Sequence, residues 1–369
     1  MSRSETYQRS LEHFRARIAM SKPQARGQRP DGCQTCDAAP DDKAERAKAA
    51  DAAKRAAKFR GKIVVIMPCR NEGDWPVRTI RSFRKSKAPG TELQFVVVDD
   101  GSDDDALRKI RRAPDIRYLR ADLPNGQGVS RSIAVYLFRG ADGYVSIDSH
   151  EELRKPHVLE QIVINAQETG GIVGTLSGAM MDDKPDTTLS AIGKSWRAFD
   201  QLGFWQVGTD SVGRTGEYLQ PIQILRGACY AFTEETFDRL GGFGESYGYY
   251  GFFERDLSVN CAFLGVPQFV NTRVRSWHYY RKQRPYFMAG RWLWWGYIEC
   301  WRQRFRQKVW RKWLMPAAED MAKRLDDPMM YYLLRTPKLD VLQAAYEAKK
   351  KRSDEQVLRW MGFPIEEAS

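Results

Sequence analysis

A carboxylate and an imidazole lie two residues apart at the end of a short apolar run, and together they could bind a metal ion. The run from Tyr144 to Ile147 has the composition of a buried strand, and Asp148, Ser149 and His150 follow it. Side chains two residues apart in an extended segment point to the same side, so Asp148 and His150 can face one ion. Oxygen combined with imidazole favours Mn²⁺ or Mg²⁺ over a structural zinc ion.

Short apolar runs alternate with helical stretches ahead of this motif, and they predict the framework that positions it. Strands are expected at 63–67, 95–98 and 116–119, each followed by a helix, at 77–85, 104–112 and 129–139. This order predicts an α/β fold with a mainly parallel sheet covered by helices. Such sheets bind ligands beyond the carboxyl ends of their strands, so the polar residues there are the candidate site.

Four strand ends carry those polar residues, at 68–73, 99–103, 124–128 and 148–150. Asp99 and Asp100 can accept hydrogen bonds from a ribose or a base edge. Gly126 and Gly128 lead into a helix that carries Arg131, so this loop offers backbone N–H groups and a cation to a phosphate. The four ends are therefore expected to form one cleft that binds a nucleotide.

These motifs resemble the nucleotide-sugar-binding half of GT-A glycosyltransferases. The Asp-x-His at 148–150 is similar to that of the polypeptide N-acetylgalactosaminyltransferase-like branch of the family 2-like enzymes, where it replaces the commoner Asp-x-Asp. The resemblance covers about residues 62–287 and implies a Rossmann-like GT-A sheet. The matching segments are 66–72, 98–103, 148–150, 226–232, 240–243, 254–258 and 277–282.

The resemblance also implies a set of site residues. Asp148, His150 and His278 would hold Mn²⁺ or Mg²⁺, which binds the diphosphate of a UDP-sugar donor. The residues expected to bind this donor are Pro68, Arg70, Asn71, Glu72, Asp99, Asp100, Gly128, Arg131, Asp148 and Arg281.

Two carboxylates, Glu254 and Asp256, are the expected catalytic pair. Inverting relatives use a carboxylate of a Glu-Asp pair to deprotonate the acceptor, whereas the branch resembled here retains configuration. This chain departs from both patterns, because Arg255 separates the two acids. The sequence therefore predicts a retaining hexosyl- or N-acetylhexosaminyltransferase, and leaves open which acid faces the sugar.

Changes in composition along the chain predict three regions: a polar and helical extension at 1–60, a catalytic domain at 61–287 and a basic helical region at 288–369. Residues 43–58 of this extension have a composition that strongly favours a helix, and the extension is not expected to build a core. Its Cys33 and Cys36 could be half a zinc site or a surface coincidence. The scattered cysteines indicate reduced thiols, and no apolar stretch is long enough to span a membrane, so a cytoplasmic location is expected.

The acceptor is predicted from the charge between Asn271 and Trp313. This segment holds nine Arg and three Lys against one acid, Glu299, and seven of the eleven Trp. Such a surface can track the phosphates of a nucleic acid, and a hydroxymethylated base in DNA is the favoured acceptor. The same residues could instead lie at an anionic membrane surface, or form helices that pack their aromatic side chains inward.

Two further alternatives stay open. The acceptor could be a cell-envelope lipid or glycan, or a protein Ser or Thr. The chain could also be a non-catalytic module that binds nucleotide sugars or nucleic acid, although a binder has little use for a full metal site.

Overall fold

The computed structural model describes residues 43–104, 107, 110–122, 125–181, 184–191, 196–198, 205–207, 216–225, 228–244, 252–279, 290–313 and 315–361. The chain divides into two units, Met1–Ala38 and Ala39–Ser369, and every described residue belongs to the second. The predictions for Cys33, Cys36 and Arg281 lie outside the described residues.

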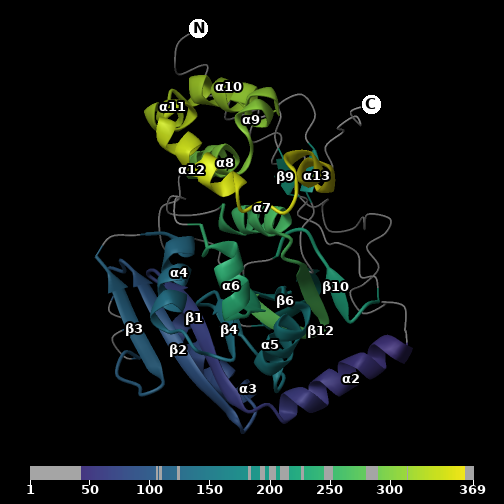
Figure 1. Ribbon diagram of the computed structural model, residues 1–369. Coiled ribbons are helices and arrows are strands. Elements are labelled where there is room, and N and C mark those ends of the chain that lie inside the picture. Colours follow the sequence, from purple (N-terminus) through teal and green to yellow (C-terminus); the bar gives the residue numbers. More distant parts are fainter. Residues whose placement is uncertain are drawn as a thin grey trace. The chain divides into compact units, whose positions relative to one another are not determined.

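Ten of the described strands form one sheet, and four neighbouring strands of it form a parallel block (Figure 1). The parallel strands are, in spatial order, β3 (Ile116–Ala121), β2 (Thr91–Asp100), β1 (Gly61–Cys69) and β4 (Gly143–Ile147). Helix α3 (Trp75–Ser86) connects β1 to β2, and α4 (Gln127–Leu137) connects β3 to β4. The predicted α/β fold is confirmed here.

The rest of the sheet is mixed. Strand β11 (Cys229–Phe232) runs antiparallel to β4 and β6 (Ile172–Met181), and β12 (Gln268–Tyr279) runs parallel to β6. Short antiparallel strands complete the sheet: β5 (Glu151–Glu152) and β10 (Leu219–Pro221) pair with β12, and β7 (Lys184–Ala191) pairs with β6. Strands β8 (Trp196–Ala198) and β9 (Trp205–Val207) form a separate pair.

Helices cover both faces because side chains alternate along a strand. From β1, Ile63 and Val65 join a core with α3 and α5 (Val158–Thr169), whereas Val64 and Ile66 join a core with α4 and α6 (Glu234–Leu240). The four described cysteines are free and buried, as expected for reduced thiols.

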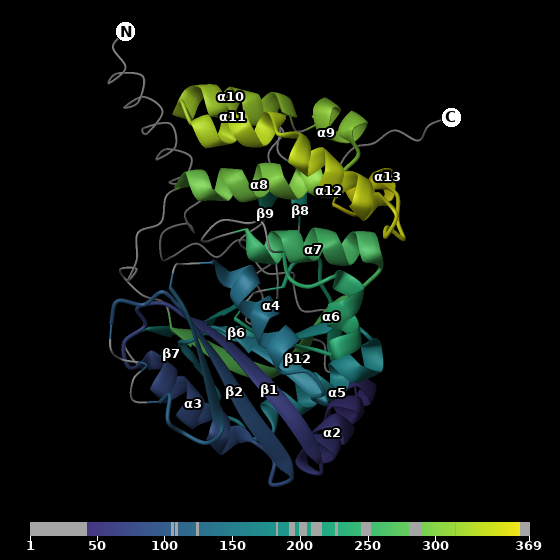
Figure 2. The ribbon, with the colours of Figure 1, turned by 60° about the vertical axis from the view of Figure 1, so that its left-hand side comes forward.

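A third core joins α7 (Phe253–Leu264) to helices formed by the C-terminal part of the chain (Figure 2). Those helices are α8 (Gly290–Arg304), α9 (Gln307–Trp313), α10 (Met315–Leu325), α11 (Pro328–Arg335), α12 (Pro337–Glu347) and α13 (Asp354–Trp360). One side of α7 packs on the sheet domain and the other on this helical layer. Among the described residues, the helices are all too short or too polar to cross a membrane.

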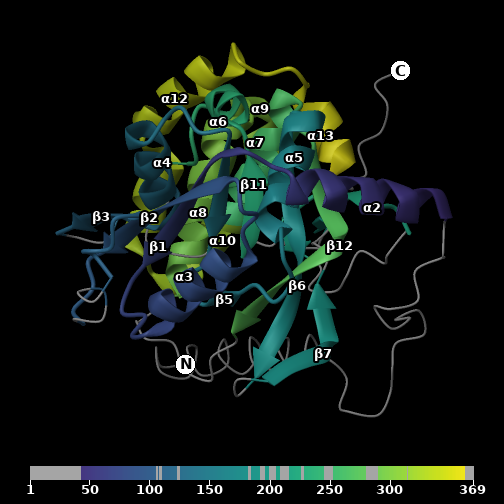
Figure 3. The same cartoon turned by 90° about the horizontal axis from the view of Figure 1, so that it is seen from below.

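Two expectations are corrected. Helix α2 (Lys43–Ala57) forms where predicted but packs on α5 (Figure 3), with Ala52 and Ala56 buried, so this part of the N-terminal extension does contribute to the fold. In the stretch predicted as a helix at 104–112, the described residues form turns instead, and Leu107 and Ile110 enter the core.

Candidate active site

The three residues predicted as metal ligands lie together at one edge of the sheet. The Nε2 atoms of His150 and His278 are 3.1 Å apart, and His278 Nε2 is 3.5 Å from Asp148 Oδ2. One ligand atom from each residue lies within 4.8 Å of the others. The structure thus brings Asp148, His150 and His278 together, although the two histidines are 128 positions apart in the sequence, and their role as metal ligands stays a prediction.

Strand pairing brings the distant histidine to the motif. Asp148 follows the end of β4, and its backbone N–H donates to the carbonyl oxygen of Ala228, 2.9 Å away. After the motif, β5 pairs with the end of β12, with Glu151 opposite His278. The N–H of Tyr279 donates to the carbonyl oxygen of His150 at 3.1 Å. The backbone therefore fixes both ends of the cluster.

The donor atoms fit a divalent cation. Two imidazole nitrogens that face each other at 3.1 Å must share a proton or bind a common cation, because two lone pairs at this distance repel. Bonds of about 2.1 Å in an octahedral shell place neighbouring ligand atoms about 3 Å apart. Each of the three side chains is about one fifth exposed, so an ion could enter and keep open positions for a ligand.

Glu72 orients one of the two histidines. Its Oε2 lies 3.1 Å from His150 Nδ1, and its side chain is 5% exposed. A carboxylate at Nδ1 accepts the proton of that nitrogen and leaves the Nε2 lone pair facing the cluster, an arrangement common at metal-binding histidines. Glu72 was predicted to bind the sugar donor directly, and the structure places it behind His150 instead.

Arg131 orients Asp148, as Glu72 orients His150. Its Nη2 donates to Asp148 Oδ1 at 3.2 Å and its Nε to Ser146 Oγ at 2.6 Å, while the guanidinium lies 4.8 Å from the ring of Phe253. Burial raises the pKa of the Asp148 carboxyl, but the hydrogen bond with His278 and the charge of Arg131 outweigh this effect and hold the pKa below its ordinary value. Arg131 is buried, so the prediction that it contacts a phosphate is corrected.

The carboxylates after β2 organise loops. Asp99 is 1% exposed and accepts from Ser102 N, Tyr118 Oη and Arg120 Nη1. Asp100 accepts from the backbone N–H groups of Asn125 and Gly126, at 2.7 and 3.1 Å. These acceptors were expected to face a ribose or a base. The structure instead uses them to hold the loop after β2 and the loop before α4.

The loop after β1 is tied to the loop after β2. Asn71, at φ 52°, donates its backbone N–H to Ser102 Oγ at 3.0 Å and accepts from Asp103 N at 2.7 Å. Pro68 and Arg70 flank this contact and are partly exposed at the strand end, where the prediction that they meet the donor stays a prediction.

Gly128 has a packing role. A Cβ atom at this position would lie 2.4 Å from the carbonyl oxygen of Gly244, so only glycine allows α4 to approach that backbone. The predicted phosphate-binding role of the glycine loop is therefore corrected in part: the N–H of Gly126 already donates to Asp100, and Gly128 is buried.

The two predicted catalytic carboxylates have different surroundings. Arg304 binds both oxygens of Asp256, at 3.1 and 3.2 Å, and this pair is buried under the helical layer. Glu254 is partly exposed and adjoins Phe253, which packs on Arg131. Burial raises the pKa of Tyr230 to about 12, and the charges of Glu254 and Asp148 add to this rise. Glu254 thus follows a residue that packs on Arg131, whereas the catalytic assignment of Asp256 is corrected to a structural ion pair.

The Arg/Trp-rich segment is folded inward over much of its described length. Trp301 and Trp310 are buried, and Trp294 and Trp295 pack on the same core. Arg302 is also buried, and its guanidinium donates to the carbonyl oxygen of Leu333. Of the interpretations left open for this segment, aromatic packing onto the domain describes its helices best.

Sequence reasoning missed two groups that support the site. Ser146 precedes Asp148 by two residues in a strand, and this spacing could have shown that both face Arg131. A second group, the cations of α3 and of the segment 151–156, was not singled out although these residues line a cavity.

Comparisons with known proteins agree with this architecture. Residues 64–218 match the family model for glycosyl transferase family 2. No curated protein sequence matches the chain. The crystal structure of GalNAc-T7 with UDP, GalNAc and Mn²⁺ is similar in fold, with a TM-score of 0.63 and 13% identity over 82% of this chain and 56% of that one. This chain thus spans little more than half of that structure.

Two other solved structures match with lower TM-scores. They are the mannosyltransferase PcManGT from Pyrobaculum calidifontis in complex with GDP-Man and Mn²⁺ (TM-score 0.44, 17% identity, 83% of this chain and 84% of that one) and S. aureus TarS 1–349 in complex with UDP-GlcNAc (0.46, 14%, 78% and 91%). The predicted resemblance and the GT-A fold are confirmed: residues 64–218 match the family model for glycosyl transferase family 2, and the fold is similar to that of GalNAc-T7.

Proposed function

We propose that this chain is a metal-dependent glycosyltransferase that moves a sugar from a nucleotide sugar to a hydroxyl group of an acceptor. The observation that carries the proposal is the cluster of Asp148, His150 and His278, built at the carboxyl edge of a GT-A sheet and oriented from behind by Glu72 and Arg131. A binding module would not require ligands held in place by a second set of buried charges.

The cluster would hold Mn²⁺, or Mg²⁺ as the alternative. A carboxylate and imidazoles suit such a cation, and GalNAc-T7 was solved with UDP, GalNAc and Mn²⁺. When bound, the cation supplies a Lewis acid that offsets the charge developing on the diphosphate leaving group. Glu72 keeps the proton of His150 at Nδ1, and Arg131 keeps Asp148 ionised and aimed at the cluster.

The proposed donor is a UDP-hexose or UDP-N-acetylhexosamine, with retention of configuration. Both points rest on the resemblance to the GalNAc-T-like branch. Glu254 is the carboxylate proposed to face the sugar, because it is partly exposed beside Phe253 and Arg131. An NMR assignment of the anomeric proton in the product tests retention, and an inverted product would contradict it.

The acceptor is the less supported part of the proposal. DNA with a hydroxymethylated base was favoured because of the Arg/Trp-rich segment, and the inward packing of that segment removes much of this support. Among its described cations Arg302 and Arg304 are buried, whereas Arg291, Arg306, Lys308, Arg311 and Lys312 are exposed. An acceptor on an envelope glycan or lipid, or on a protein hydroxyl, is therefore at least as well supported.

One experiment tests the activity before the acceptor is known. The protein is incubated with a panel of UDP-sugars, with Mn²⁺ or with EDTA, and released UDP is measured with and without hydroxymethylated DNA, glycan and peptide acceptors. UDP release that requires the metal and rises with one acceptor class supports the proposal. UDP binding without turnover under all conditions would instead support a nucleotide-sugar-binding module.

A further inference from the structure

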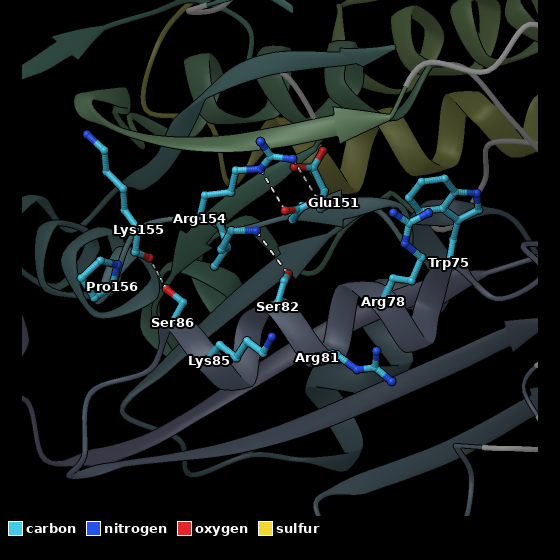
Figure 4. Close-up of a pocket in the computed structure, with 12 residues that line it drawn as sticks. Trp75, Arg78, Arg81, Ser82, Lys85, Ser86, Glu151, Arg154, Lys155 and Pro156 are labelled. Carbon is cyan, nitrogen blue, oxygen red and sulfur yellow. Dashed lines mark hydrogen bonds and ion pairs between the residues drawn. The ribbon is translucent and has the colours of Figure 1, made fainter. Parts of the chain in front are cut away.

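A cavity of about 500 Å³ lies between α3 and the segment 151–156 (Figure 4). Glu151, which lines it and is 2% exposed, directly follows His150 and is paired with His278. At the same end, the ring of Trp75 packs on that of Tyr279, which follows His278. The cavity therefore starts one residue from two of the metal ligands, and its volume is that of a small-molecule site.

The lining of this cavity is positively charged. Five cations contribute to it: Arg78, Arg81, Lys85, Arg154 and Lys155. Glu152 pairs with Arg154 at 2.9 Å. The charged groups of Arg81, Lys85 and Lys155 have neither an ion pair nor a hydrogen bond with any residue that the structure describes. Even with the buried glutamate counted, the lining keeps an excess of positive charge that a multiply charged anion would neutralise.

The two walls of the cavity are fixed to each other. From α3, Ser86 donates to a backbone carbonyl oxygen of the opposite segment at 2.7 Å and Ser82 accepts from a backbone N–H there at 3.2 Å, while Thr79 donates to the carbonyl oxygen of Ser149, just before that segment, at 2.9 Å. These hydroxyls are three and four residues apart and so lie on one face of the helix. Each follows a cation by one residue, which places those cations along the neighbouring face. The site is thus built in advance of any ligand.

The ring of Trp75, at the end of the cavity, contacts a cation and a second ring, so neither of its faces is free for stacking. The centroid of the Tyr279 ring lies 4.1 Å from that of Trp75, and the guanidinium of Arg78 lies 4.2 Å from the same centroid. Two groups this close cannot share one face of an indole, so they cover both. Recognition of a base by stacking, which binding of single-stranded nucleic acid requires, is therefore disfavoured here.

We propose that this cavity is the subsite for the anionic part of the acceptor. The acceptor would be a hydroxyl-bearing molecule with two or more phosphate or carboxylate groups. Arg78 and Lys85 are seven residues apart, about 10 Å along the helix, so neighbouring anionic groups could each meet a cation. The assignment of the cavity to an acceptor rests on the proposed function. Binding of an anion to the cavity can be tested without turnover.

The test measures binding of tripolyphosphate to the full chain in EDTA by calorimetry, with citrate as the carboxylate probe. The triple substitution Arg81→Ala/Lys85→Ala/Lys155→Ala should weaken the affinity for the better-bound probe about tenfold or more, because it removes three charge-assisted contacts. The matched control is Lys54→Ala/Lys58→Ala/Lys349→Ala, which removes three exposed cations elsewhere and should leave the affinity within about twofold.

Binding of UDP in Mn²⁺ is measured on the same proteins and separates the two proposals. Normal UDP binding by the parent and both variants, with anion affinity lost only in the first variant, supports the subsite. Equal anion affinity in the parent and both variants would overturn the subsite and leave the proposed function standing. Failure of the parent to bind UDP would overturn the proposed function, while the anion titration still decides the subsite. Tighter binding of a single-stranded oligonucleotide than of tripolyphosphate, lost in the same variant, would overturn the assignment in favour of nucleic acid.

Discussion

Two aspartate–arginine pairs in this protein have the same chemistry and different surroundings. Asp148 and Arg131 lie at the edge of the sheet, where the aspartate side chain is 25% exposed and contacts His278. Asp256 and Arg304 lie between α7 and α8, where both side chains are at most 10% exposed. The first pair holds a carboxylate toward solvent and two imidazoles, whereas the second joins a helical layer to the domain.

The difference shows that the solvent-facing neighbours of an ion pair, rather than the pair itself, identify a site. Arg131 and Arg304 both have a structural role. Only Asp148 has further donor atoms that converge on the same point, because the ends of β4 and β12 meet there. The predictions below separate the two pairs by function and by stability.

The largest effect is expected from Asp148→Ala. Removal of this carboxylate takes away one of the three proposed ligands and the carboxylate partner of Arg131, so metal-dependent turnover should fall by about three orders of magnitude or more. UDP release is measured over a range of Mn²⁺ concentrations. Turnover within about tenfold of the parent at saturating metal would show that Asp148 is not a ligand.

Disruption of the second pair, Asp256 and Arg304, should lower the stability of the protein. Asp256→Ala leaves the buried Arg304 guanidinium uncompensated, and the free energy of unfolding should fall by about 3–5 kcal/mol. Urea unfolding measures this change. Asp148→Ala serves as the comparison, since its partly exposed pair should lose less stability. A stable Asp256→Ala variant without activity would reverse the assignment and return Asp256 to the chemistry.

Glu72→Gln tests whether Glu72 orients His150 beside the first pair. An amide cannot accept the His150 proton as strongly as a carboxylate, so the affinity for Mn²⁺ should fall about 10- to 100-fold while UDP release recovers at high Mn²⁺. The matched control is Glu160→Gln, because Glu160 is also buried but accepts from Ala88 and Thr91 far from the cluster. Unchanged Mn²⁺ affinity in Glu72→Gln would remove its orienting role.

The smallest effect concerns the pH dependence of the helical layer near the second pair. Burial raises the pKa of Glu299 to about 8, with a further rise from the charge of Asp256 and an opposing effect of Lys338. The folded chain therefore holds this proton more tightly than the unfolded chain, and stability should fall as the pH rises from about 4.5 to about 8.

Glu299→Gln removes this loss and should stabilise the protein at pH 8 by on the order of 2 kcal/mol, with little change at pH 4.5. Thermal or urea unfolding at both pH values measures it. The exposed Glu235→Gln is the control and should show no such difference. A destabilised Glu299→Gln variant at pH 8 would mean that the ionised carboxylate has a structural partner.

The part of the fold that follows local rules was predictable. The strands at β1, β2, β3 and β4 and the helices α2, α3 and α4 form where apolar runs and helical stretches predict them. The helix predicted at 104–112 is not seen in its described residues, because Ile110 enters the core from a turn and a period of apolar residues does not distinguish this from a helix.

The candidate site was predictable in its residue types and only partly in their roles. The two-residue spacing of Asp148 and His150 predicted that both face one point. In the structure the two residues follow β4 in a turn, and backbone hydrogen bonds with Ala228 and Tyr279 hold them there. Family resemblance supplied His278. That Asp99, Asp100, Arg131 and Glu72 support loops and ligands was decided by tertiary contacts, since a carboxylate or guanidinium has the same chemistry whether its partner is a ligand or another residue.

The same distinction holds for the charged segment near the C-terminus. The sequence determined that 271–313 is rich in arginine and tryptophan, and hence that it is either a binding surface or a set of packed amphipathic helices. Only the tertiary structure decided between them for the described helices, by burying Trp301 and by giving Arg304 the acceptor it needs in Asp256. Whether a long amphipathic side chain packs or binds depends on which surface lies opposite it, and that surface comes from residues far away in the chain.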